Sequence, residues 1–281
     1  SKYSDIITKN PYIRNVYLID NIDNSYKQIL RSNKYDIIVD LQNNLRSIQI
    51  RNILKNKTYV LGKQTIRRWI LIYLGINLLG NHIVDRYFNA VKSLGVNNDN
   101  QGIDFFINNS LKLDIDIPKD YITWCISATH INKRLSSKHI LEVISRLEVP
   151  VFLIGGDTED KEASVIMKSV KTDHVINLCG KTTIQQSASL IKESKLLLTN
   201  DTGMMHIASA FKTPLITFWG CTKPSLGFYP YISHEKVINI ISNKSNRPCS
   251  KHGRYCRFNK DICINQIKSD NIYKSITKLL K

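Results

Sequence analysis

Short apolar segments alternate along the chain with segments whose apolar residues recur at helical spacing. This alternation is typical of βα units and predicts a mostly parallel sheet. In the first half we predict strands at 16–19, 35–40, 58–61 and 103–107, and helices at 25–31, 45–54, 65–74 and 82–94. In the second half we predict strands at 121–127, 149–154, 175–178, 196–199, 215–218 and 237–241, and helices at 136–147, 159–170, 183–194, 204–211 and 267–280.

The stretch 108–119 is the best linker candidate, because it alternates Leu and Ile with Asp and then reaches Pro118. We therefore predict a first lobe at 1–115, a second lobe at 120–265 and a C-terminal helix at 266–281. A doubly wound lobe usually has five or six strands, and the first half supplies only about four. The chain also begins with Ser1 rather than Met. The predicted fold class is α/β, with two Rossmann-like lobes of which the first lacks its opening βαβ unit.

The chain has 281 residues and a formal net charge of +17, from 40 Lys+Arg against 23 Asp+Glu. Two interpretations stay open: the excess lies on solvated faces, or it serves an acidic partner such as a phosphorylated substrate or an anionic membrane. No zinc-finger spacing, RNA-binding signature or helix-turn-helix is found, so no nucleic-acid partner is expected. The longest apolar run, 69–79, is shorter than the roughly 20 residues of a membrane-spanning helix. No signal segment opens the chain, so a cytoplasmic location is expected.

The strongest local signal is a buried strand at 196–199 that leads through a polar turn directly into a helix. The first turn of that helix, at Thr202 and Gly203, presents unpaired amides which favour an anion such as a diphosphate. Gly203 allows the anion to approach the backbone without a Cβ in the way. His206 can point its ring at the same anion. The alternative is an ordinary helix cap made by Asp201 or Thr202.

Polar residues also follow the three earlier strands of the second half. Thr129 and Lys133 follow the first of them, and a hydroxyl with an ammonium group suits a phosphate. The carboxylates of Asp157 and Glu159 follow the next strand and suit ribose hydroxyls, and Thr182 follows the third. Each has a plain alternative as a solvated loop or a helix cap. Since the carboxyl ends of parallel strands meet at one edge, their coincidence predicts a nucleotide site.

Several motifs together carry a family resemblance, above all Asn-Asp-Thr-Gly-Met-Met-His at 200–206. Others are found at 35–47, 82–87, 133–134, 155–159, 180–183 and 218–224. These motifs resemble glycosyltransferase family 9, which contains the lipopolysaccharide heptosyltransferases, over essentially the whole chain. The resemblance implies a GT-B fold with a cleft between two lobes. It also implies inverting transfer of a heptose or related sugar from an ADP-activated donor to the lipopolysaccharide inner core.

The resemblance further implies site residues. It assigns contacts with the donor diphosphate to Thr129, Lys133, Thr202, Gly203 and His206. It places Glu159 at the ribose, Thr182 near the adenine, and Asp201 beside the sugar or in support of the turn. Arg46 of the first lobe would face the acceptor, a lipid-linked anionic saccharide. No metal or other cofactor is implied.

The family's catalytic base comes from the first βα loop of the first lobe, which we expect upstream of residue 1. Two alternatives to an active transferase therefore stay open. One is a catalytically inactive remnant that still binds the donor. The other is a different two-lobed sugar-nucleotide enzyme, such as an epimerase, which would need no acceptor.

Cys249, Cys256 and Cys263 recur every seven residues in a stretch that also holds His252. Three cysteines and a histidine would suit Zn²⁺, but the spacing matches no common zinc module. Free thiols in a reducing cytoplasm are the favoured interpretation. The other three cysteines are expected to be core thiols: Cys125, Cys179 and Cys221.

The predicted helix at 67–74 has a basic start and an apolar body. A buried helix of the first lobe is the favoured interpretation. The alternative is a helix face that rests on the inner leaflet of the membrane, where a lipid-linked acceptor would reside.

Overall fold

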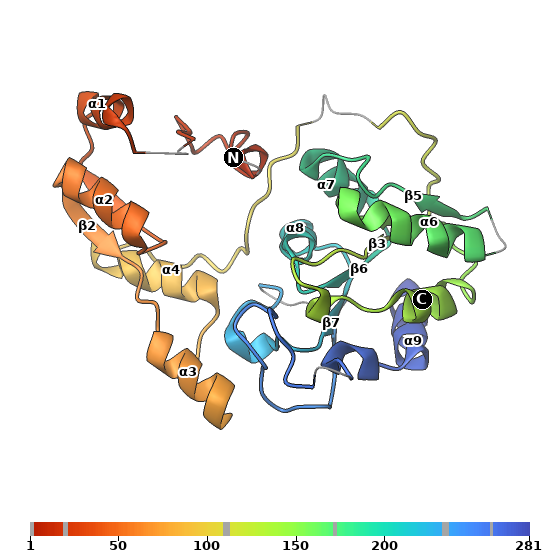
Figure 1. Cartoon of the computed structure of the whole chain (residues 1–281). Coiled ribbons are helices and arrows are strands. Elements are labelled where there is room, and N and C mark those ends of the chain that lie inside the picture. The colour runs from red at the N-terminus through yellow and green to blue at the C-terminus, as the bar shows by residue number, and fades with distance from the viewer. Residues whose placement is uncertain (1–2, 19–21, 109–112, 171–172, 232–235, 259–260) are drawn as a thin grey trace.

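The computed structural model describes residues 3–18, 22–108, 113–170, 173–231, 236–258 and 261–281. The chain forms a smaller first lobe and a larger second lobe (Figure 1). Among the described helices, none combines the length and the apolar character needed to cross a membrane.

The second lobe is built on a six-stranded sheet in which all neighbouring strands are parallel. Its strands are β3 (Ile122–Cys125), β4 (Val151–Ile154), β5 (Val175–Asn177), β6 (Leu196–Asn200), β7 (Leu215–Trp219) and β8 (Val237–Ile241). Their order across the sheet is β5-β4-β3-β6-β7-β8, which is the order of a dinucleotide-binding Rossmann fold. All six strands were predicted from the sequence.

Helices cover both faces of this sheet, because alternate residues of each buried strand point to opposite faces. On β6, Leu196 and Leu198 pack in one core and Leu197 in the other. The first core is closed by α5 (Ser137–Ile144), α6 (Asp160–Ser169) and α9 (Ser269–Leu280). The second is closed by α7 (Ile184–Glu193) and α8 (Gly203–Phe211).

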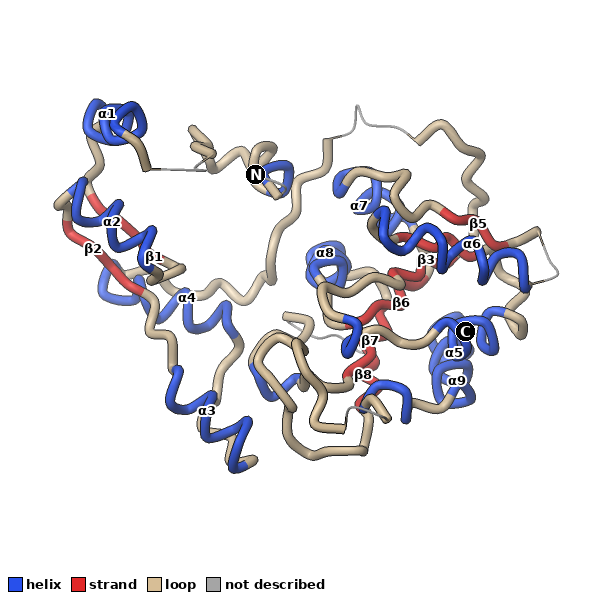
Figure 2. Tube along the Cα trace, in the orientation of Figure 1, coloured by secondary structure: helices blue, strands red, loops and turns tan. Residues whose placement is uncertain are grey.

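The first lobe has one pair of parallel strands among its described residues, drawn in red in Figure 2. Its elements are α1 (Asn24–Ser32), β1 (Ile37–Asp40), α2 (Leu45–Leu54), β2 (Lys57–Val60), α3 (Thr65–Leu74) and α4 (Ile83–Val91). Short 3-10 turns complete the described structure at Ser4–Ile6, Lys92–Leu94, Ile131–Lys133, Asp157–Glu159, Pro224–Leu226 and Cys263–Gln266.

Two strands predicted for the first half are wrong. Residues 16–18 form no strand, and Ile19 lies outside the described residues. Residues 103–107 form no strand either. Instead, the Phe105 and Ile107 side chains pack against the core of the second lobe. A strand needs a neighbour for its backbone groups, and in the described first lobe β1 and β2 pair only with each other.

The two lobes touch through the segment 226–231 of the second lobe. The Tyr229 carbonyl accepts a hydrogen bond from His82 Nε2 at 2.8 Å, and the Gly227 carbonyl accepts one from the Ile83 amide at 2.9 Å. The Tyr231 hydroxyl donates to Asp85 Oδ1 at 2.8 Å. Leu226 packs in an apolar cluster with residues of α3 and of the turn after it. These contacts place the start of α4 beside the second lobe.

Candidate active site

The strand order of the second lobe reverses between β3 and β6. In open parallel sheets, the loops that leave the carboxyl ends of such a pair diverge and leave a crevice, in which ligands bind. Here these loops are residues 126–136 and the turn 201–202. They carry most of the predicted diphosphate contacts.

Lys133 and Asp201 meet at this point. Lys133 Nζ lies 2.8 Å from Asp201 Oδ2, and both side chains are mostly buried. His206, one turn into α8, is electrostatically coupled to both: burial lowers the pKa of its imidazole, Asp201 raises it and Lys133 lowers it. The net direction of the pKa is downward, which favours the neutral imidazole. The site thus holds an ammonium group and a neutral imidazole side by side.

The start of α8 is open. The side chain of Thr202, the N-cap residue, makes no capping hydrogen bond to the helix. Its hydroxyl lies 3.0 Å from that of Thr199 instead. Gly203 is exposed, and a Cβ built on it would meet no atom within 4 Å. Helix amides that no capping side chain satisfies and no neighbour covers are suited to an anion.

Asn200 holds the two loops together, a role that the sequence analysis missed. Its buried amide nitrogen donates to the carbonyls of Ile126 and Ser127, at 3.2 and 3.1 Å. Its oxygen accepts from the Leu135 amide at 3.1 Å. An asparagine in a strand–turn–helix motif is the available signal, but its partners lie more than sixty residues away. These three bonds set the loop of Lys133 against the turn of Asp201.

The remaining predicted residues are placed as follows. Thr129 is exposed on the loop after β3, and Arg46 is exposed in the first turn of α2. Glu159 is 5% exposed, and its carboxylate accepts from the Gly156 amide at 2.9 Å and pairs with Arg134 at 3.1 Å. Thr182 Oγ1 lies 2.8 Å from Ser187 Oγ. The structure thus brings Lys133, Asp201, Thr202, Gly203 and His206 together. The binding role of each predicted residue, these five included, stays a prediction.

A group of cations from both lobes also lies near Lys133, and the sequence analysis did not single it out. The Arg86 side chain is 4% exposed, and its Nε and one terminal nitrogen have no hydrogen-bond partner among the described residues. Arg68 Nε is likewise unsatisfied. Partial burial, with repulsion from Arg68, Lys63 and Arg86, lowers the pKa of Lys251. Arg68 also donates from one terminal nitrogen to the Lys63 carbonyl at 2.8 Å, so Arg86 is the least satisfied cation of the group. A buried guanidinium with unsatisfied donors is costly, so this group is suited to a bound anion.

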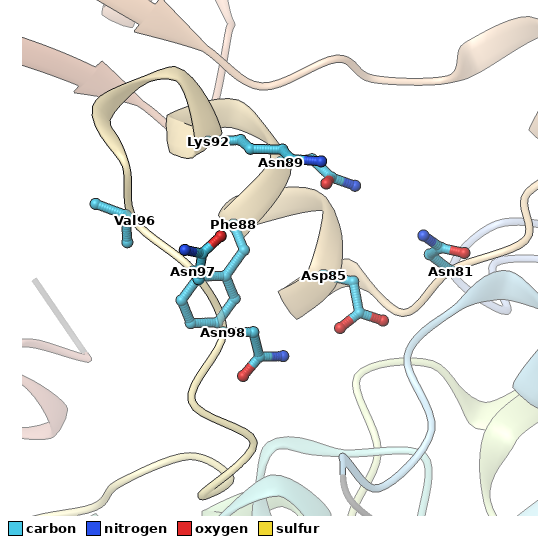
Figure 3. A pocket seen from close by; sticks show the side chains of 8 residues that line it. All are labelled: Asn81, Asp85, Phe88, Asn89, Lys92, Val96, Asn97 and Asn98. Carbon is cyan, nitrogen blue, oxygen red and sulfur yellow. The ribbon is translucent and has the colours of Figure 1, made fainter.

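A small cavity of about 210 Å³ lies beside α4, lined by Asn81, Asp85, Phe88, Asn89, Lys92, Val96, Asn97 and Asn98 (Figure 3). None of the predicted donor residues lines it. Asp85 belongs to it and accepts a hydrogen bond from Tyr231. All the lining residues belong to the first lobe, and two of them, Asp85 and Asn98, are hydrogen-bonded to Tyr231 of the second lobe.

Solved structures share this architecture. A glycosyl transferase family 9 structure from Veillonella parvula superimposes with a TM-score of 0.75 at 20% identity, over 99% of this chain and 86% of that one. The E. coli heptosyltransferase WaaC, solved with ADP, gives 0.65 at 18% identity, over 91% and 76%. These likenesses show the two-lobed GT-B fold.

The family model described as "Glycosyltransferase family 9 (heptosyltransferase)" matches residues 24–260, and the chain belongs to this family. Lipopolysaccharide heptosyltransferase 2 of Escherichia coli is 32% identical over 117 residues, 39% of this chain and 33% of that protein. The chain thus spans about a third of the length of the first curated relatives it matches. Lipopolysaccharide heptosyltransferase 1 of Campylobacter coli is 23% identical over 99% of this chain and 87% of its own length.

Proposed function

We propose that the protein transfers a heptose or related sugar from an ADP-activated donor to the lipopolysaccharide inner core. The observation that carries this proposal is the pairing of Lys133 with an open helix start at the switch point of the sheet. Family membership and the relatives' names support the class of reaction and the acceptor. A solved relative that holds ADP supports the choice of nucleotide.

The chemistry follows from the charges. In inverting transfer, positive charge develops on the sugar ring and negative charge on the departing diphosphate. Lys133 and the first amides of α8 would stabilise the diphosphate, and the neutral His206 would donate a hydrogen bond to it. A carboxylate base would deprotonate the acceptor hydroxyl.

We expect the donor to bind without a metal ion. Lys133 and the helix dipole already supply positive charge at the predicted diphosphate position. Binding of ADP should therefore be equally tight in EDTA and in Mg²⁺. A clear gain of affinity with Mg²⁺ would contradict this part of the proposal.

The acceptor is proposed to be anionic and lipid-linked. Arg46, Arg68 and Arg86 of the first lobe are suited to its acidic groups.

The exposed face of α3 supports peripheral contact with the inner face of the membrane. Ile66 is 76%, Trp69 54% and Leu74 60% exposed on this helix, although Leu71 and Ile72 are buried. Apolar side chains beside basic ones favour an anionic membrane surface.

The membrane contact is tested by flotation with vesicles of anionic or of neutral lipid. The wild-type protein should float with anionic vesicles and lose this binding when Trp69 and Leu74 are both changed to Ser. Equal recovery of wild type and variant would refute the contact without touching the donor site.

The donor site is tested by calorimetric titration with ADP. Lys133→Ala and His206→Ala should weaken ADP binding roughly 10- to 100-fold, because each removes a hydrogen bond to a charged group. Lys138→Ala is the matched control, since its side chain is 82% exposed on α5. Wild-type protein that binds no ADP, or equal effects of all three variants, would refute the site.

A transfer assay distinguishes an active transferase from an inactive donor-binding remnant and from an epimerase. Incubation with ADP-heptose and heptose-free core lipopolysaccharide should yield ADP and a heavier acceptor. Binding of ADP without transfer identifies the inactive remnant. Conversion of the donor without any acceptor identifies an epimerase.

A further inference from the structure

Four cysteines that are distant in the sequence lie together in the second lobe, beyond the carboxyl ends of β7 and β8. Cys221 follows β7, Cys249 and Cys256 lie in the loop after β8, and Cys263 begins the next 3-10 turn. All four are buried, and their sulfur atoms lie within 4.8 Å of one another. The cluster therefore includes Cys221, which the sequence analysis treated as a core thiol. It does not include His252, which lies among cations near Lys133.

The spacing of the sulfur atoms fits a shared metal ion. Cys249 and Cys263 Sγ atoms lie 3.8 Å apart, and those of Cys256 and Cys263 lie 3.6 Å apart. A disulfide would require about 2.05 Å. Four sulfur atoms placed tetrahedrally at about 2.3 Å from one ion are separated by about 3.8 Å. These two distances match that value, and every other pair of the four sulfur atoms lies within 4.8 Å, which is close enough for one shared ion.

We propose that Cys221, Cys249, Cys256 and Cys263 bind one Zn²⁺ or iron ion as thiolates, in a structural centre whose four positions are all filled by protein. Tetrahedral sites of four sulfur ligands select these metals. Each thiol loses its proton to solvent as the ion binds. Four thiolates and a doubly charged ion leave a net charge of −2.

Lys223 and Arg257 lie close enough to the cysteines to offset this negative charge. Lys223 is 4% exposed and donates to the Ser242 carbonyl at 2.5 Å. Lys223 lies close enough to Cys221, Cys249 and Cys263 to interact with them electrostatically. Arg257 is adjacent to Cys249 and donates to the Pro248 carbonyl at 3.2 Å. A buried lysine facing four neutral thiols is costly, and facing a negatively charged centre it is stabilised.

The loop between β8 and Cys263, which carries Cys249 and Cys256, would be fixed in place by a bound ion. Its described residues, 242–258 and 261–262, form neither helix nor strand. Long irregular segments are uncommon in compact domains unless something fixes them. The Cys249 amide donates to the Cys221 carbonyl at 2.7 Å, which ties this loop to the end of β7. One ion would close the loop at Cys249, Cys256 and Cys263 together.

The cross-linked loop supports the donor site. Gly253, at φ +76, packs so closely on Lys133 that a Cβ would come within 2.4 Å of its Cγ. Asn132 Nδ2 donates to the carbonyls of Gly253 and Arg254, at 3.3 and 3.1 Å. Loss of the ion should therefore weaken ADP binding by displacing Lys133. This consequence rests on the proposed function, whereas the metal content does not.

The test is elemental analysis of the purified full chain, prepared without chelator. We expect one zinc or iron ion per chain, and loss of it in Cys256→Ser and Cys263→Ser. Cys179→Ser is the control, because Cys179 is also buried but lies outside the cluster. Cobalt added to metal-free protein should give the intense visible bands of a tetrahedral cobalt thiolate. Either metal supports the proposal, and equal metal content in all three variants overturns it.

A second measurement keeps the test decisive if the variants fail to fold. Thiols of the wild-type chain are counted after denaturation, with the metal analysed in the same sample. Six free thiols with one ion support the centre. Folded wild-type protein that lacks bound metal and takes up neither zinc nor cobalt overturns it, as does mass spectrometry showing disulfides among these four cysteines. ADP binding by such metal-free protein would leave the proposed function standing.

Discussion

Lys133 and Asp201 form an ion pair of 2.8 Å although their loops follow different strands, β3 and β6. The pair lies where the order of the sheet reverses, beside the open start of α8. Asp201 thus compensates the positive charge of Lys133. An anion that binds at the helix start would compete with this carboxylate for the ammonium group.

Asp201→Asn should strengthen ADP binding, because it removes a negative charge that repels the diphosphate and competes for Lys133. The expected gain is on the order of 1 kcal/mol, or about fivefold in Kd. Titration calorimetry measures it. Asp120→Asn is the control, since it breaks an exposed pair with Lys195 at the opposite end of β3. Weaker binding by Asp201→Asn would mean that its carboxylate orients the site.

Gly203→Ala should separate binding from stability. A Cβ at this position meets no atom of the described residues within 4 Å beyond its own helix, so the free energy of unfolding should change by less than about 1 kcal/mol. The same Cβ would lie where the anion approaches the amides, so ADP binding should fall at least tenfold. Gly62→Ala, which also meets no atom within 4 Å, should change neither quantity. Unchanged ADP affinity in Gly203→Ala would exclude the helix start as the anion site.

Arg86→Met should leave the fold as stable as wild type or make it more stable. Two nitrogen atoms of this buried guanidinium have no hydrogen-bond partner in the part of the chain that the structure describes. Replacing the guanidinium with an apolar side chain therefore removes a desolvation cost. Transfer to the anionic acceptor should fall strongly. Urea denaturation and the transfer assay measure the two effects, with the exposed Arg67→Met as control. A large loss of stability would instead make Arg86 a structural residue.

His82 should make the stability of the protein depend on pH. Burial lowers the pKa of His82 in the folded state, where its Nε2–H donates to the Tyr229 carbonyl. The unfolded chain, with an imidazole pKa of about 6.5, then binds more protons in acid. Stability should fall as the pH drops below about 6.5, and His82→Gln should reduce this slope. Urea denaturation at about pH 7.5 and pH 5.5 compares the two proteins, and identical slopes would contradict the prediction.

The local pattern of apolar and capping residues was sufficient to predict the helices and every strand of the second lobe. The predicted bounds of α2 and α3 coincide with those observed, and Thr183 caps α7 as predicted, with its side chain accepting from the Gln186 amide. These features depend on residues three or four positions apart. The strands predicted at 16–19 and 103–107 failed because an extended segment becomes a strand only beside a partner.

By itself the sequence determined the fold class, the family and the strand–turn–helix that carries Asp201, Gly203 and His206, because these follow from periodicity and contiguous motifs. Only the tertiary structure decided that Lys133 pairs with Asp201, that Asn200 ties their loops, and that Cys221 joins three cysteines far along the chain. The tertiary structure also decided that Arg86 of the first lobe is buried against Gly227 of the second. Contacts between distant residues depend on how the sheet and its loops pack in space, and no local spacing encodes them.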